Sequence, residues 1–150
     1  ILLQSSAKRA VSIDRSNGEM QVRSGTVWSK VVFSHPWIAE GVSDYEMQRT
    51  RIDAAALQSG RMATPTVVVA GGMSADGDLY LLVGPHDTRR GYRVIRVSSD
   101  GTQTKAITCA TDNTPNGFNP VFITPAERGT FILADLLGHF RAYEVSADLE

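Results

Sequence analysis

The chain has 150 residues, of which 42% are hydrophobic and 21% are charged, and its net charge is -1. This composition is typical of one globular domain and excludes a disordered or fibrous protein. The nearly balanced charge, without a basic stripe, argues against a nucleic-acid-binding module. The single cysteine, Cys109, excludes an intrachain disulfide but does not fix the compartment. The apolar runs are too short to cross a bilayer, so no transmembrane segment is predicted.

Residues 1–64 contain short β-favouring stretches whose boundaries are indistinct. In chain order these stretches are residues 1–4, 11–14, 20–22, 27–28, 31–33 and 49–52. A short helix is predicted at residues 53–60, where Asp53 supplies an N-cap and Gly60 follows the last turn. Because a helix of barely two turns is marginal without tertiary support, we interpret it as a connector. The chain starts at Ile1 rather than Met, so we expect the natural N-terminus to be missing through processing or truncation.

Clear strand signals follow from residue 65 onward. They are rich in β-branched and aromatic residues and are separated by clusters of Gly, Pro, Asp and Asn. In chain order they cover residues 66–70, 79–83, 92–97, 102–107, 121–123, 131–134 and 140–145. The pattern predicts an antiparallel all-β fold with little helix. The core positions that it predicts are Val67, Val69, Leu81, Ile95, Phe122, Ile132 and Tyr143.

Two patterns recur along the chain. The first is an alternating strand that ends in Ile or Val, then a polar residue and a turn, and its anchors are Ile13, Ile52, Val97 and Val145. These anchors lie about 40 to 50 residues apart, which is typical of four-stranded propeller blades. The second pattern precedes the first: an apolar strand leads into a turn that contains His35, His86 or His139. We therefore interpret the anchor strand as the third of each blade and the strand before it as the second.

Four segments carry a resemblance to a known superfamily: "SADGDLYLLV", "YRVIRVSSDG", "FNPVFITPAERGTFILAD" and "FRAYEVS". They resemble the superfamily of NHL-repeat and related six-bladed propellers, well over residues 65–150 and poorly over residues 1–64. No Trp-Asp dipeptide is present, which argues against the WD40 family. The resemblance implies a propeller, slightly favours an extracytoplasmic location, and allows for a metal, since some propeller lyases of this kind bind one through loop histidines.

The repeat count predicts an incomplete ring. The chain supplies about three blades, whereas propellers have about four to eight. We therefore expect one β domain over residues 1–150 that belongs to a larger propeller or assembly, with further polypeptide or another subunit completing the open edge. The apolar residues 1–4 are predicted to pair beside residues 140–145. The alternative fold is a small β-sandwich.

Three histidines are the candidate metal ligands. His35, His86 and His139 each follow a predicted second strand, and equivalent turns of a propeller lie on one face of the disc. Imidazoles gathered on one face could ligate zinc or another transition metal. The alternative is that they are polar turn residues that never meet, in which case the protein has no cofactor. The Asp-Gly pairs Asp76-Gly77 and Asp100-Gly101 are interpreted as tight turns rather than calcium ligands.

Aromatic and basic residues are the candidate binding residues. Trp28, Trp37 and Tyr45 form the most aromatic segment, and such residues are common in interfaces. The alternative for them is packing within or between blades. Arg89 and Arg90 could contact an acidic partner, although alternating arginines on a strand usually mark its solvent face.

No catalytic constellation is present. The sequence has no Gly-x-Ser-x-Gly elbow, and Cys109 has no nearby partner for nucleophilic catalysis. The sequence therefore favours a non-catalytic propeller scaffold for protein or ligand binding and complex assembly. Two alternatives stay open: a propeller enzyme of the lyase or hydrolase type with its site on the face of the histidine turns, and a structural subunit that docks on a larger complex.

Overall fold

The structure is a computed structural model that describes residues 1–6, 9–31, 33–44, 46–47, 66–87, 91–109 and 118–144. Within these residues, eleven strands form three antiparallel sheets. The first sheet contains β1 (Leu2–Ser6), β2 (Arg9–Ile13), β3 (Met20–Ser24) and β4 (Val27–Val31). The central sheet contains β5 (Val68–Met73), β6 (Leu79–Asp87), β7 (Gly91–Val97) and β8 (Thr104–Cys109). The last sheet contains β9 (Phe122–Pro125), β10 (Thr130–Ala134) and β11 (Phe140–Glu144).

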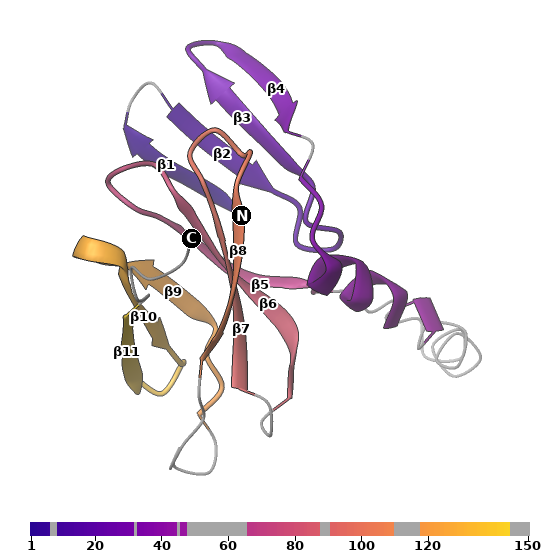
Figure 1. Ribbon diagram of the computed structural model, residues 1–150, viewed down its shortest axis with the longest axis vertical. Helices are drawn as coiled ribbons and strands as arrows, with labels where there is room; N and C mark the ends of the chain where they lie inside the picture. The colour runs from indigo at the N-terminus through magenta and orange to yellow at the C-terminus, as the bar shows by residue number, and fades with distance from the viewer. Residues whose placement is uncertain are drawn as a thin grey trace.

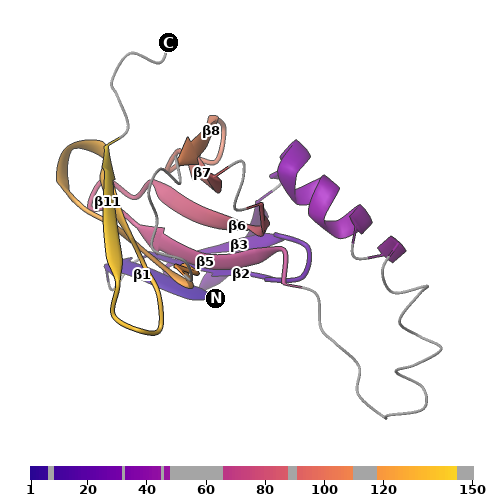
Figure 2. The same cartoon turned by 90° about the horizontal axis from the view of Figure 1, so that it is seen from below.

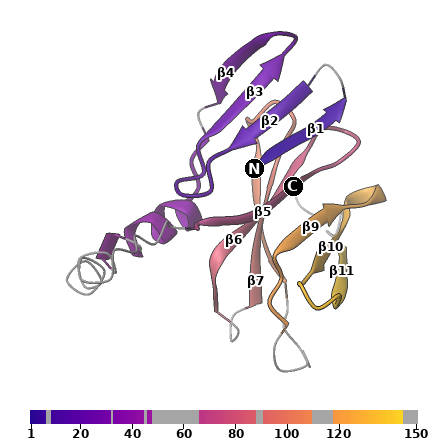
Figure 3. The ribbon, with the colours of Figure 1, turned by 180° about the vertical axis from the view of Figure 1, so that it is seen from behind.

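Each sheet is a meander in which consecutive strands are neighbours (Figures 1 and 3). Between β9 and β10 lies a 3-10 turn, η1 (Glu127–Gly129), and residues 36–44 and 46–47 are helical. Figure 2 shows this helix beside the first and central sheets, on the side away from the last sheet. The all-β prediction is therefore confirmed, and the three antiparallel meanders are arranged like consecutive propeller blades.

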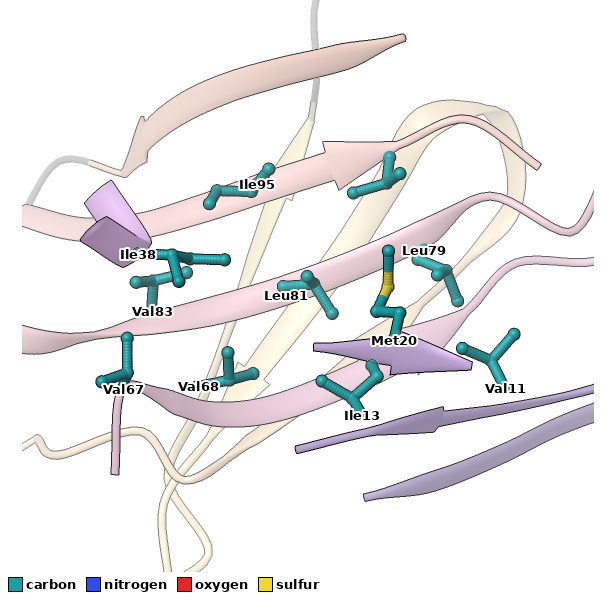
Figure 4. Packing of buried hydrophobic residues seen from close by; sticks show 11 residues of the cluster. Val11, Ile13, Met20, Ile38, Val67, Val68, Leu79, Leu81, Val83 and Ile95 are labelled. Carbon is teal, nitrogen blue, oxygen red and sulfur yellow. The ribbon is translucent and has the colours of Figure 1, made fainter. Parts of the chain in front are cut away.

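The central sheet is covered on both faces, which explains its continuous apolar run at residues 79–83. Side chains alternate across a strand, so Leu79, Leu81 and Val83 face the first sheet. There they pack with Val11, Ile13 and Met20 (Figure 4). The neighbouring residues of β6 face the other way, toward the last sheet.

The second core lies between the central and last sheets. Tyr80 and Leu82 of β6 pack here against Phe131 and Leu133 of β10. The rings of Tyr80 and Phe131 lie with centroids 5.6 Å apart, and the Tyr92 hydroxyl donates a 3.0 Å hydrogen bond to the Phe118 carbonyl. The three sheets therefore form one stack, with the central sheet in the middle.

Most strand positions match the prediction. β5 and β9 are first strands, β6 and β10 second strands, β7 and β11 third strands, and β8 is a fourth strand. Val67, Leu81 and Ile95 are buried as predicted, whereas Val69, Ile132 and Tyr143 are half-buried. Phe122 is wrongly predicted, because its side chain is 52% exposed. It alternates with Ile123, whose side chain takes the inward position on β9.

Three predictions for the first blade are wrong. Ile13 ends the second strand of its sheet, so it is not equivalent to Val97 on a third strand. β1 pairs with β2 rather than with β11, because the two strands are close in sequence and pair at little entropic cost. His35 follows a fourth strand, β4, rather than a second strand. The predicted helix at residues 53–60 and the anchors Ile52 and Val145 lie outside the described residues.

Candidate functional site

Two of the candidate histidines lie in connections between secondary-structure elements. The β2–β3 and β10–β11 turns each follow the second strand of their sheet (Figure 1). The helix of residues 36–44 begins beside the β2–β3 turn (Figure 3). His35 lies at the start of this helix and His139 lies in the β10–β11 turn, and the shared face expected for the histidines stays a prediction.

His139 is held in the β10–β11 turn by Asp135. The buried Asp135 carboxylate accepts hydrogen bonds from the backbone amides of Leu137 and His139, each at 2.9 Å, and lies 2.9 Å from His139 Nδ1. Burial opposes ionisation of Asp135, yet the hydrogen bonds from His139 and Leu137 hold its pKa below the usual value. A cavity of about 330 Å³ adjoins this turn and is lined by Phe118, Gly138, His139, Phe140 and Arg141.

His35 is the N-cap of the helix. Its carbonyl accepts hydrogen bonds from the amides of Ile38 and Ala39, at 3.0 and 3.1 Å, and its Nδ1 accepts a 3.2 Å hydrogen bond from the Trp37 amide. Pro36 occupies the first helical position, where its missing N–H costs nothing. Burial lowers the pKa of His35. The sequence analysis missed this helix, although a side-chain acceptor followed by Pro was a usable start signal.

A groove of about 430 Å³ separates the helix from the β2–β3 turn. His35, Ile38 and Val42 contribute from the helix side, together with Phe33. Glu19 from the turn and Glu46 from the helix place two carboxylates on the same groove. This arrangement combines an apolar floor, an imidazole and negative charge.

The two predicted tryptophans lie on different surfaces. Trp37 is half-buried against the core between the first and central sheets, and the Arg93 guanidinium lies 5.3 Å from its ring centroid. Trp28 is 42% exposed on the face of the first sheet that points away from the central sheet. Trp37 therefore packs between blades, which is the alternative to a binding role that the sequence left open. Tyr45, Arg89 and Arg90 lie outside the described residues.

The predicted metal site stays a prediction. His86 lies within β6, but its side chain is not among those that the structure describes. Within the described part of the chain, no three His, Cys, Asp or Glu side chains are grouped closely enough to hold a metal ion. The Asp-Gly pairs form turns, as predicted: Gly77 and Gly101 have positive φ, and Asp100 accepts hydrogen bonds from Ser98 and Thr102.

The last sheet has an apolar free face, which the sequence analysis did not identify. Register places Phe122, Ala134 and Phe140 in one row across the three strands, on the face opposite Phe131 and the second core. Phe122 and Phe140 are 52% and 72% exposed. The corresponding free face of the first sheet is more polar, and Gln21 and Lys30 are paired across it. Exposed apolar patches of this kind mark interaction surfaces.

The comparisons with known proteins support the fold and leave the family open. No family model and no curated protein matches the chain. Its structure is similar to a solved structure titled "YCF48 bound to D1 peptide", with a TM-score of 0.55, 7% sequence identity and coverage of 95% of this chain. The chain spans 35% of that protein's length. No helix among the described residues is long and apolar enough to cross a membrane. The structural similarity identifies a propeller-like arrangement, without confirming the NHL type.

Proposed function

We propose that this chain is a non-catalytic β-propeller scaffold that binds polypeptide, and that the last sheet accepts a further antiparallel sheet that completes the assembly. The observation that carries the proposal is the apolar free face formed by Phe122, Ala134 and Phe140. Solvent-facing sheet surfaces are more commonly polar. On the free face of the first sheet the exposed Leu2 and Trp28 are accompanied by Gln21, Arg23 and Lys30. The neighbour titled "YCF48 bound to D1 peptide" supports a polypeptide as the general class of partner.

The stacking order argues for another sheet as the occupant. Each of the two internal interfaces joins the apolar faces of two antiparallel sheets, and the free face of the last sheet continues that series. β11 also lies at the edge of its sheet, where the described residues place no strand beside it, whereas the other two sheets have fourth strands there. An exposed edge strand is a template for pairing with more polypeptide.

A second copy of this chain fits the face less well. In a head-to-tail contact, the second copy would have to bury the free face of its first sheet, including Arg23, Gln21 and Lys30. Burying such polar groups without partners costs free energy. A further sheet with an apolar face, like those in the two cores, avoids this cost.

The test uses purified residues 1–150. While no further sheet covers it, we expect the apolar face to bind an apolar dye and, at high concentration, to associate weakly face to face with the same surface of a second copy in sedimentation experiments. Phe140→Asp should reduce both signals while changing the free energy of unfolding by no more than about 0.5 kcal/mol, because its side chain is 72% exposed. Trp28→Asp, on the other free face, is the matched control and should leave both signals unchanged. A well-folded monomer with one sharp unfolding transition and no dye binding would contradict the proposal.

A further inference from the structure

The groove beside the helix is built by an element that departs from the blade repeat. The helix of residues 36–44 follows β4, and its Ile38 side chain is buried in the core between the first and central sheets. Arg93 of β7 fixes the helix from the other side, through a 3.0 Å ion pair with Glu40 and its contact with Trp37. The helix wall of the groove is therefore held in place by the core and by the central sheet.

His35 presents a hydrogen-bond donor at this groove. Its Nδ1 accepts the Trp37 amide hydrogen, so the neutral ring carries its proton on Nε2. The residue is 9% exposed and lines the groove. Among the described residues, Arg23 Nε is the buried side-chain polar atom without a partner, so His35 Nε2 is open to solvent at the groove. Burial lowers the pKa of His35, which favours the neutral ring. A donor that is open to the groove can give its hydrogen bond to a peptide carbonyl of a bound chain in place of water.

Negative charge and apolar surface complete the groove. Glu19 lies 2.9 Å from Lys30 in an exposed ion pair, and both of these side chains are more than half exposed. Glu46 is exposed and has no ion pair among the described residues. Phe33, Ile38 and Val42 supply an apolar surface along which the methylene stem of a long cationic side chain can lie.

We infer that this groove binds a basic stretch of polypeptide, with a Lys or Arg side chain along the apolar floor toward Glu46 and a backbone carbonyl accepting from His35 Nε2. The volume of about 430 Å³ suits one long side chain and its flanking peptide groups. The groove and the free face of the last sheet lie on opposite sides of the central sheet. This second polypeptide site is therefore independent of the assembly proposed above.

The probe is a fluorescein-labelled peptide, Ala-Leu-Lys-Leu-Ala with blocked ends, titrated against the protein in low salt. Replacing its lysine by norleucine keeps the stem and removes the charge, which should weaken binding about three- to fivefold. Glu46→Gln should weaken binding of the lysine peptide by the same factor and leave the norleucine peptide unchanged. Glu127→Gln, in η1 and exposed, is the matched control and should change neither titration.

His35→Asn tests the carbonyl contact. Asn is itself a favoured N-cap, so the variant keeps an acceptor for the helix amides while it removes the Nε2 donor. His35→Asn should weaken binding of the lysine and norleucine peptides by equal factors, whereas Glu46→Gln should weaken binding of the lysine peptide alone. Binding of the norleucine or a glutamate peptide as tightly as the lysine peptide would overturn the inference. The inference would also be overturned if Glu46→Gln and Glu127→Gln lost the same amount of affinity for the lysine peptide. It would be overturned as well if butylammonium bound as tightly as the peptide.

Discussion

Gly72→Ala tests the contact between the central and last sheets at its tightest point. Gly72 lies in β5, directly against β9 of the last sheet. A Cβ at this position would lie 2.4 Å from Pro125 Cδ and 2.8 Å from the Ile123 carbonyl oxygen. Both distances are below ordinary van der Waals contact, and the second involves backbone. The whole β9 strand must therefore move for the methyl group to fit.

The expected cost follows from these distances. Overpacking of a tight contact destabilises by about 1–3 kcal/mol, and the reduced entropy of the unfolded chain returns about 0.4–1 kcal/mol. We expect a net loss of about 1–2 kcal/mol in the free energy of unfolding, which corresponds to a fall of about 2–8 °C in the melting temperature.

Gly84→Ala is the matched control. Its new Cβ would lie 3.5 Å from the Thr66 carbonyl oxygen and 3.5 Å from Val69 Cγ2, which is ordinary contact. This variant should leave the stability unchanged or raise it by up to about 1 kcal/mol. Both variants are compared by urea unfolding followed by circular dichroism. Equal stability of Gly72→Ala and Gly84→Ala would refute the packing of β5 against β9.

Three further predictions concern single side chains. Burial raises the pKa of the Cys109 thiol to about 12, so iodoacetamide should label it only at the rate of unfolding; rapid labelling in the native state would contradict its burial. Hydrogen bonds from Ser98 and Thr102 lower the pKa of Asp100 from 3.8 to about 2. The stability that this carboxylate contributes is complete above pH 4 and is lost as the pH falls toward about 2. Asp100→Asn should therefore make the free energy of unfolding fall less steeply as the pH drops from 4 toward 2. An unchanged slope would contradict the hydrogen bonds that Asp100 accepts in this turn. Phe131→Ala, at a fully buried position of the second core, should cost about 3–5 kcal/mol in urea unfolding, and a loss below about 1 kcal/mol would exclude that core.

The central and last sheets follow from the sequence because their strands carry strong local signals. The run at residues 79–83 is apolar on both faces, which is what a strand between two covering sheets requires. The turns after β5 and β7 place Asp before a glycine of positive φ, at Gly77 and Gly101. Local propensity, turn chemistry and tertiary packing agree in this half of the chain, so the strand order was predictable.

The first sheet was harder to predict because an alternating strand has the same appearance at any position in a blade. Ile13 and Val97 both end strands before turns, yet one strand is second and the other third. The alternation at β9 identifies two faces without saying which is buried, which is why Phe122 was assigned to the core.

The candidate site depends on contacts that no single segment contains. Glu19 and Glu46 come together only because the helix returns beside the β2–β3 turn. His35 was singled out as a possible metal ligand, but its role as an N-cap depends on a helix that the sequence analysis did not predict. The free face of the last sheet likewise becomes visible only once the other face of β10 is seen to be buried.

Amide hydrogen exchange of residues 1–150, resolved by residue, tests the stacked arrangement most directly. The amides of β6 and β7 should be the slowest to exchange, because these strands are internal to a sheet that is covered on both faces. β11 lies at the edge of a sheet with one free face, so its amides should be the fastest among the strands of the central and last sheets. Equal protection of β11 and β7 in the isolated chain would contradict a stack in which the central sheet is covered on both faces and the last sheet is open on one.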